Sequence, residues 1–141
     1  MNERDTIDAC LTHCHTIAVV GLSPKTHRDS FRVSQYMQAR GYRIVPINPN
    51  ASEILGERVY ATLSEAAQHE RIDMVNCFRN ADDIAPIAQE AVAIGAKALW
   101  MQLGIAHEAA AQQARNAGLW VVQDRCLKVE HALHPPRAVA G

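Results

Sequence analysis

The chain has 141 residues, 48% of them hydrophobic, and its 14 basic and 15 acidic side chains leave a net charge of −1. A chain of this length fits one domain that buries roughly two-thirds of its unfolded surface, so its core needs no disulfide or metal. The balanced charge excludes the broad basic field that draws proteins to nucleic acid or to anionic membranes. We therefore predict a single domain, 1–141, in which any anion site is local.

The sequence also indicates where the protein works. Its N-terminus lacks the basic start and apolar core of a signal peptide, and no apolar run approaches the ~20 residues that span a bilayer. The four cysteines, Cys10, Cys14, Cys77 and Cys126, are too few and too dispersed for a secreted disulfide framework. These features predict a cytoplasmic protein with reduced thiols.

The first two predicted elements are a short helix and a buried strand. From about Asp5 to Cys14, apolar or thiol side chains follow the i, i+3, i+4, i+7 spacing of one helix face, so 1–15 is a leading helix. Thr16–Val20 carries no charge and is β-branched except for Ala18, which is typical of a central parallel strand buried on both faces.

The next helix and strand have clear boundary signals. The helix is predicted from Ser30, as its N-cap, to Arg40, and Gly41 ends it. Tyr42–Ile47 is predicted as the second strand, with Pro46 near its end because proline cannot donate to an interior ladder.

The rest of the chain continues this alternation after one irregular segment. Ala51 to Tyr60 is expected to be irregular with a turn at Gly56, and a short helix over 64–68 is expected to start at a Ser64 cap. Further strands are predicted at Asp73–Phe78, Lys97–Met101 and Leu119–Gln123, helices from Asp82 to Ile94, His107 to Ala117 and Cys126 to Leu133, and a frayed tail over 134–141.

Strands and helices alternate at steps of about twenty to thirty residues, the spacing of βαβ units. This predicts a Rossmann-like, doubly wound α/β sheet of about five parallel strands with helices on both faces. Ligands bind such sheets at the carboxyl ends of the strands, so the functional loops are those after Gly21, Ile47, Phe78, Met101 and Gln123.

The loop Leu22–Ser30, after the first strand, is the clearest candidate for binding an anion. Only Gly21 remains of the dinucleotide fingerprint, and the Walker pattern is absent. Ser23, Lys25, Arg28 and the N–H groups at the helix start can nevertheless converge on a phosphate. The alternative is a solvated turn with a serine cap. The strand–turn–helix context favours a phosphate-binding turn.

The end of the second strand argues against ordinary NAD chemistry. NAD enzymes place a carboxylate about twenty residues beyond the glycine loop to hold the adenosine ribose. Here the strand ends in the uncharged Asn48-Pro49-Asn50, which avoids repelling a phosphate on the ribose, as in coenzyme A or NADP. This stretch can equally be a simple turn.

Two later loops supply further candidates. Phe78 and Arg79 follow the third strand, and Arg79 either meets a ligand phosphate or forms a surface ion pair with Asp82 or Asp83. After the fourth strand come Gln102 and Gly104, and Gly104 either allows a ligand to approach the backbone or only permits a tight turn.

The sequence contains no complete catalytic set. Cys10, His13, Cys14 and His15 suggest zinc, but this spacing on one helix face favours core packing, so no metal site is predicted. Cys126 lies near a helix start and His131 follows it. A reactive Cys126 stays open, although a structural role is favoured.

These residues together resemble the small single-domain CoA-binding proteins, whose domain is similar to the CoA-binding domain of the succinyl-CoA synthetase alpha subunit. The match runs from about Ile17 to His131 through Ala18-Val-Val-Gly-Leu-Ser23, Arg28 with Ser30, Gly41-Tyr-Arg-Ile-Val-Pro-Ile-Asn-Pro49, Val75-Asn-Cys-Phe-Arg79, Ala96-Lys-Ala-Leu-Trp-Met-Gln-Leu-Gly104 and Asp124-Arg-Cys-Leu-Lys-Val-Glu-His131. The resemblance implies that the first-strand loop holds the nucleotide end of CoA. The candidate cofactor-binding residues are Gly21, Leu22, Ser23, Lys25, Arg28, Ser30, Asn48, Pro49, Phe78, Arg79, Gln102 and Gly104.

Two departures from the family limit what is carried over. In the synthetase a phosphorylated histidine from a second domain performs the chemistry, and this chain ends before such a domain, so ligase activity is not expected. Asp29 stands where the family often has proline or a small residue, and its carboxylate either weakens phosphate binding or caps the helix.

The resulting expectation is a protein that binds coenzyme A or an acyl-CoA with no catalysis of its own. One alternative is an NAD(P)-dependent oxidoreductase on the same fold, which needs a proton donor such as Cys126 or His131. Another is a subunit that completes a site only with a protein partner or as a homo-oligomer.

Overall fold

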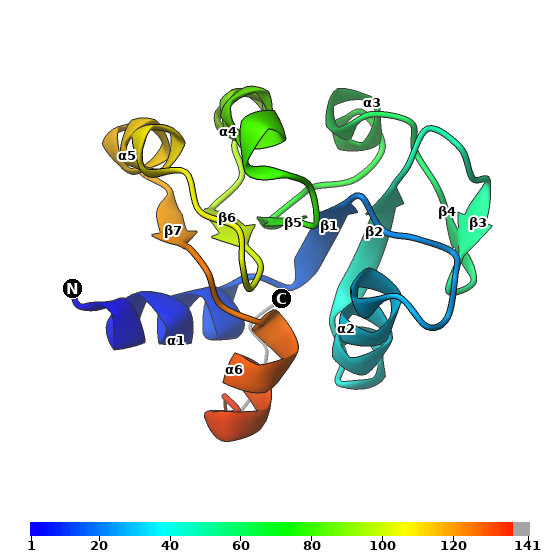
Figure 1. Cartoon of the computed structure of the whole chain (residues 1–141), viewed down its shortest axis with the longest axis horizontal. Coiled ribbons are helices and arrows are strands. Elements are labelled where there is room, and N and C mark those ends of the chain that lie inside the picture. The colour runs from blue at the N-terminus through cyan, green and yellow to red at the C-terminus, as the bar shows by residue number, and fades with distance from the viewer. Residues whose placement is uncertain (137–141) are drawn as a thin grey trace.

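The computed structural model describes residues 1–136 and contains a five-stranded parallel sheet between two layers of helices (Figure 1). The sheet order is β2-β1-β5-β6-β7, with β1 Thr16–Val20, β2 Arg43–Ile47, β5 Met74–Cys77, β6 Ala98–Met101 and β7 Trp120–Val122. The helices are α1 Glu3–His13, α2 Asp29–Ala39, α3 Leu63–Ala67, α4 Ile84–Ala93, α5 Glu108–Asn116 and α6 Leu127–Leu133. The predicted Rossmann-like, doubly wound sheet is confirmed.

Each face of the sheet is covered by its own set of helices. Helices α1, α2 and α6 cover one face and α3, α4 and α5 the other (Figure 1). Side chains alternate along β1, so Ile17 and Val19 join the core under α1, α2 and α6, while Ala18 joins the other core. Trp100 of β6 is fully buried in the first of these cores.

The position of β1 in the sheet determines where a crevice opens. The chain passes from β1 outward to the edge strand β2 and later returns to β5 on the other side of β1. The loops after β1 and β5 therefore leave the sheet toward opposite faces, which opens a crevice at their carboxyl ends.

Two predicted helix caps are wrong on the far side of this crevice. The side chain of Thr62, not Ser64, caps α3 by accepting the N–H of Glu65 at 3.1 Å. Asp82 lies within a 3₁₀ turn, η1 Ala81–Asp83, that precedes α4. Both errors arise because each segment offers several residues of capping type and the local backbone decides which of them reaches the helix start.

The segment predicted as irregular between Ala51 and Tyr60 contains a small hairpin. Its strands, β3 Glu53–Ile54 and β4 Glu57–Arg58, are antiparallel and joined by Leu55 and Gly56. Both turn residues have positive φ, 55° and 75°, as a type I′ turn requires. The two-residue strands are too short to produce a recognisable alternation in the sequence.

The other predicted elements agree with the structure to within about two residues at each end. The leading helix starts at Glu3, two residues before the predicted apolar pattern begins at about Asp5, because Asn2 and Asp5 form a capping box. Within the predicted tail, 134–136 follow α6 without regular structure, and 137–141 lie outside the described residues. Among residues 1–136, no helix has the length and apolar character needed to cross a membrane.

Candidate functional site

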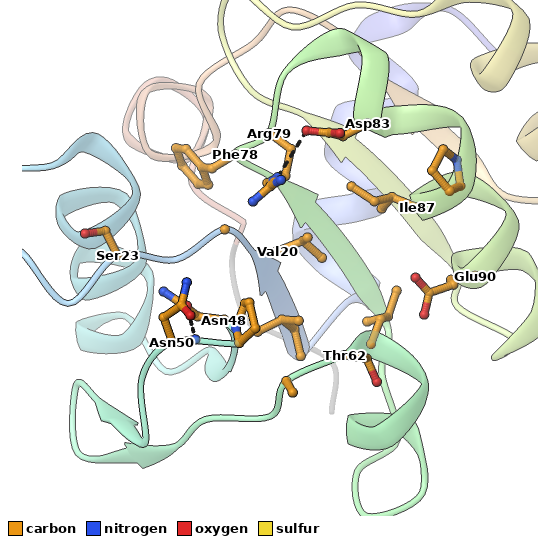
Figure 2. A pocket seen from close by; sticks show the side chains of 16 residues that line it. Val20, Ser23, Asn48, Asn50, Thr62, Phe78, Arg79, Asp83, Ile87 and Glu90 are labelled. Atoms are coloured by element: carbon orange, nitrogen blue, oxygen red, sulfur yellow. Dashed lines mark hydrogen bonds and ion pairs between the residues drawn. The ribbon is translucent and has the colours of Figure 1, made fainter.

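The crevice beyond β1, β2 and β5 contains a hollow of about 480 Å³, which we call the switch-point hollow (Figure 2). Its walls come from the loops after these three strands and from the starts of α3 and α4. A second hollow of about 440 Å³, the turn hollow, lies against the loop between β1 and α2. Gly21, Ser23 and Phe78 line both, so the two hollows adjoin.

Gly21 brings the loop after β1 against the loop after β5. Its φ is +88°, and a Cβ atom there would lie 2.5 Å from the carbonyl oxygen of Phe78 and 3.0 Å from Cδ of Arg79. A side chain at this position would meet both an unfavourable backbone conformation and a backbone atom. Glycine is therefore required for the close approach of these two loops.

The loop after Gly21 is closed by its own hydrogen bonds. The backbone N–H of Ser23 donates to Oγ of Ser30 at 3.0 Å, and the N–H of Lys25 donates to Oγ of Ser23 at 3.1 Å. The N–H of Arg28 donates to the carbonyl oxygen of Lys25, also at 3.1 Å. The prediction that Ser30 is the N-cap of α2 is therefore wrong. The buried hydroxyl of Ser30 holds the loop instead.

The start of α2 is open toward the turn hollow. Arg28 occupies the N-cap position with extended backbone, and within residues 1–136 no side chain caps the helix there. The first N–H groups of a helix have no partner inside it, and they carry the positive end of its dipole. Lys25 and Arg28 line the turn hollow with exposed cationic side chains, beside the exposed carboxylate of Asp29. This arrangement has the chemistry of an anion site.

Asn48 joins the end of β2 to the same loop. Its Nδ2 donates to the carbonyl oxygen of Leu22 at 2.9 Å, and its Oδ1 accepts the N–H of Asn50 at 2.8 Å. Asn48, Pro49 and Asn50 line the switch-point hollow, whereas the side chain of Leu22 is fully buried in the core. Leu22 thus acts on this region through its carbonyl group and its packing.

Phe78 and Arg79 lie side by side at the switch-point hollow (Figure 2), and Phe78 also reaches the turn hollow. The half-buried ring of Phe78 lines both, and Arg79 lines the switch-point hollow. Nε of Arg79 donates to Oδ2 of Asp83 at 3.3 Å, with both side chains largely exposed. Of the two acidic partners considered from the sequence, Asp83 is the one observed. An exposed pair of this kind is weak, so the guanidinium stays available to a ligand.

Gln102 and Gly104 lie away from the turn hollow. Gln102 is 4% exposed, and its Oε1 accepts the N–H of Leu127 at 3.0 Å, which holds the start of α6. The N–H of Gly104 donates to Oδ1 of Asp124 at 2.7 Å, and a Cβ at Gly104 would meet nothing within 4 Å. The structure therefore brings together the predicted residues after β1, β2 and β5, but not Gly104.

Sequence reasoning missed the wall formed by α3 and α4. Thr62, Ile87 and Glu90 line the switch-point hollow (Figure 2). The Glu90 carboxylate accepts the N–H and the hydroxyl of Ser64, at 3.2 and 2.8 Å. No motif marks these residues, because they reach the hollow only through the way two crossover helices pack on the sheet.

The thiols and His131 lie outside both hollows. Cys10, Cys14 and Cys77 are buried, and burial raises the pKa of Cys14 and of Cys77 to about 12. The predicted core packing of Cys10 and Cys14 is confirmed. Nδ1 of His131 lies 3.0 Å from the hydroxyl of Tyr36, and burial holds the pKa of His131 below its ordinary value.

Known proteins resemble this chain over most of its length. A Bacillus subtilis (strain 168) protein, the uncharacterized protein YneT, is 39% identical over 127 residues, 90% of this chain and 93% of that protein. A hypothetical protein from Pyrococcus horikoshii OT3 has a structure that superposes with a TM-score of 0.87 at 32% identity, covering 94% and 92% of the two chains. A Thermus thermophilus protein superposes at 0.82, again with 32% identity, over 94% of this chain and 98% of that one.

The family model for the CoA binding domain matches residues 15–132. This span includes the whole sheet, both hollows and the loops after β1, β2 and β5. The chain therefore belongs to the CoA binding domain family.

Proposed function

We propose that this protein binds coenzyme A or an acyl-CoA, with the diphosphate in the turn hollow and the adenosine in the switch-point hollow. The observation that carries this proposal is the open start of α2, where uncapped N–H groups lie beside the cations of Lys25 and Arg28. Membership of the CoA binding domain family supports the choice of ligand.

The diphosphate assignment follows from the charges in the turn hollow. Backbone N–H groups at a helix start form short, directed bonds to phosphate oxygens, and the helix dipole favours negative charge there. The guanidinium of Arg28 can add a bidentate contact, and Lys25 can add a compact positive charge. Asp29 lines the same hollow and opposes these cations, so it moderates the affinity.

The adenosine assignment follows from the walls of the switch-point hollow. Pro49, Ile87 and Val20 offer apolar surface for a purine ring, and Asn50 and Thr62 offer polar edges. The end of β2 has no carboxylate to clamp the two ribose hydroxyls of NAD. The carboxylate of Glu90 comes from α4 and already accepts two hydrogen bonds from Ser64. A ribose that carries a phosphate fits this arrangement better than the free ribose of NAD.

A thermal-shift panel with CoA, acetyl-CoA, NAD, NADP and ADP tests the proposal. A ligand at ~100 times its Kd adds about 2.7 kcal/mol to the free energy of unfolding. For a domain of this size, we expect a rise of several degrees in Tm with CoA or acetyl-CoA. A rise with NAD or NADP and none with CoA would contradict the proposal and favour the oxidoreductase alternative.

A further inference from the structure

A third hollow, about 400 Å³ in volume, lies between α2 and α6, and we call it the α2–α6 groove. Its walls are largely apolar and include Val33, Ile105 and Val129. On its rim Leu103 is 70% exposed and Val129 is 47% exposed, which is high for large apolar side chains. Nothing in the proposed binding of adenosine and diphosphate uses this groove.

The groove continues from the turn hollow. Phe78 and Asp29 line both hollows, and Phe78 also lines the switch-point hollow. The three hollows thus follow one another around a single aromatic ring. A long ligand can pass from one to the next without leaving the protein surface.

The groove is also lined by an amide donor that has no hydrogen-bond partner among residues 1–136. Gln102 lines the groove and is 4% exposed, and its Oε1 is occupied by the N–H of Leu127. In the described part of the chain, Nε2 of Gln102 has no hydrogen-bond partner. Nε2 is not one of the fully buried atoms without a partner, so it is accessible from the groove and can donate to the carbonyl oxygen of a ligand.

The chemical order of the three hollows matches that of an acyl-CoA. The switch-point hollow is mixed in character, and the turn hollow has two cations beside Asp29. The groove is largely apolar, with the amide of Gln102 and the charged residues Asp29, Arg32 and Lys128 also lining it. Resting on the proposed binding of CoA, we propose that the α2–α6 groove holds the pantetheine arm and a short apolar acyl group. The free Nε2 of Gln102 donates to an amide carbonyl of the arm. The apolar walls favour an apolar acyl group, because its binding there removes apolar surface from water.

Cys126 provides a direct reporter of this placement. It is a free, partly exposed cysteine that lines the groove, whereas Cys10, Cys14 and Cys77 are buried. With the disulfide of CoA as probe, the Cys126 thiolate attacks one sulfur atom, a bond forms between Sγ and that sulfur, and one CoA leaves as its thiolate. Mass spectrometry of the product identifies the modified cysteine.

The experiment compares ligands and variants by calorimetry. The ligands are 3′-phosphoadenosine 5′-diphosphate, which lacks the pantetheine arm, and CoA, acetyl-CoA and butyryl-CoA. The variants are Leu103→Glu and Val129→Glu, which change exposed residues of the groove, and Val92→Glu, a matched control on α4 that is also exposed.

We expect butyryl-CoA to bind about fifteenfold more tightly than acetyl-CoA, because each of its two additional methylenes tightens binding by roughly fourfold when fully buried. Leu103→Glu and Val129→Glu should each weaken butyryl-CoA at least fivefold and leave 3′-phosphoadenosine 5′-diphosphate unchanged, and Val92→Glu should change neither. CoA disulfide should label Cys126, and excess butyryl-CoA, which has no free thiol to reverse the exchange, should suppress the labelling.

The outcomes separate this inference from the proposed function. If 3′-phosphoadenosine 5′-diphosphate and CoA both fail to bind, the proposed function and the inference fall together. If both bind, but acyl length and the two groove variants have no effect, the inference is wrong and the proposed function stands. Labelling of Cys126 that excess butyryl-CoA does not suppress reports an accessible thiol outside the arm's site and also overturns the placement.

Discussion

Arg28 offers the sharpest test of the proposed phosphate site. It is the exposed N-cap residue of α2, and among residues 1–136 its guanidinium has no ion pair or hydrogen bond. Arg28→Ala therefore removes the cation from the turn hollow without breaking an internal contact. Arg28→Ser removes the same cation but places a hydroxyl where it can accept an N–H of the first turn.

The two variants should separate binding from stability. A hydrogen bond to a charged group contributes about 1.5–3 kcal/mol, so both variants should weaken CoA binding by roughly 10- to 100-fold. The free energy of unfolding of the Ala variant should stay within about 0.5 kcal/mol of that of the wild type. The Ser variant should be more stable than the Ala variant by about 1 kcal/mol, because serine is a favoured N-cap residue.

Calorimetry measures the affinities, and urea unfolding without ligand measures the stabilities. Arg71→Ala is the matched control, since Arg71 is exposed in the loop before β5, at the opposite edge of the sheet. It should leave the affinity for CoA unchanged. Wild-type affinity in Arg28→Ala would place the phosphates elsewhere. A Ser variant no more stable than the Ala variant would refute the open helix start.

Three further predictions concern the same loops and α6. Gly21→Ala should lower the free energy of unfolding, measured in urea, by about 3 kcal/mol, because its Cβ would lie 2.5 Å from a carbonyl oxygen. The matched control is Gly118→Ala, which should lower it by only about 1 kcal/mol, because Gly118 also has a positive φ but its Cβ would meet nothing within 4 Å. Asp29→Asn should tighten CoA binding up to about tenfold by calorimetry, since unit charges ~6 Å apart interact by about 1.4 kcal/mol at an effective dielectric constant of ~40. Burial, and secondly Arg40, lowers the pKa of His131, so below pH 6.5 the unfolded chain binds the proton more readily. The free energy of unfolding should therefore fall as the pH drops from 7 through 6.5 toward the folded-state pKa. The free energy of unfolding of His131→Asn should fall less steeply, and equal slopes for the variant and the wild type would contradict the effect.

The sheet and the general place of the site could be predicted from the sequence. Thr16–Val20 is β1 as predicted, because an uncharged β-branched run suits a strand covered on both faces. The loops after β1, β2 and β5 meet at one hollow, as the alternation of strands and helices predicts. These features depend on residue types along the chain and on the handedness of crossovers, and both can be recognised locally.

The details that failed depend on contacts between distant residues. Ser30 has the residue type of an N-cap, but its hydroxyl accepts the N–H of Ser23, seven residues earlier. The sequence does not show that Oε1 of Gln102 accepts the N–H of Leu127 at the start of α6, and the contact of Gln102 with a ligand stays a prediction. Glu90 was not considered, because only the packing of α4 carries it to the hollow. No local pattern in a single sequence indicates these contacts between distant residues.

The open start of α2 differs from the starts of the other helices. Of the six α-helices in residues 1–136, three have side-chain caps, and two more have other partners at their starts. Asn2, Thr62 and His107 cap α1, α3 and α5, the 3₁₀ turn η1 leads into α4, and Gln102 accepts an N–H of α6.

Helix α2 has no such partner, and it is the helix that faces the turn hollow beside Lys25 and Arg28. A cap adds about 1 kcal/mol of stability, which the free protein lacks at this point and a bound phosphate can supply. Folding stability and ligand affinity are therefore coupled at Arg28. A serine there would cap the helix in the free protein and leave less for the ligand to stabilise, so CoA should bind it more weakly. The Arg28→Ser variant should therefore show a smaller rise in Tm than the wild type at the same CoA concentration.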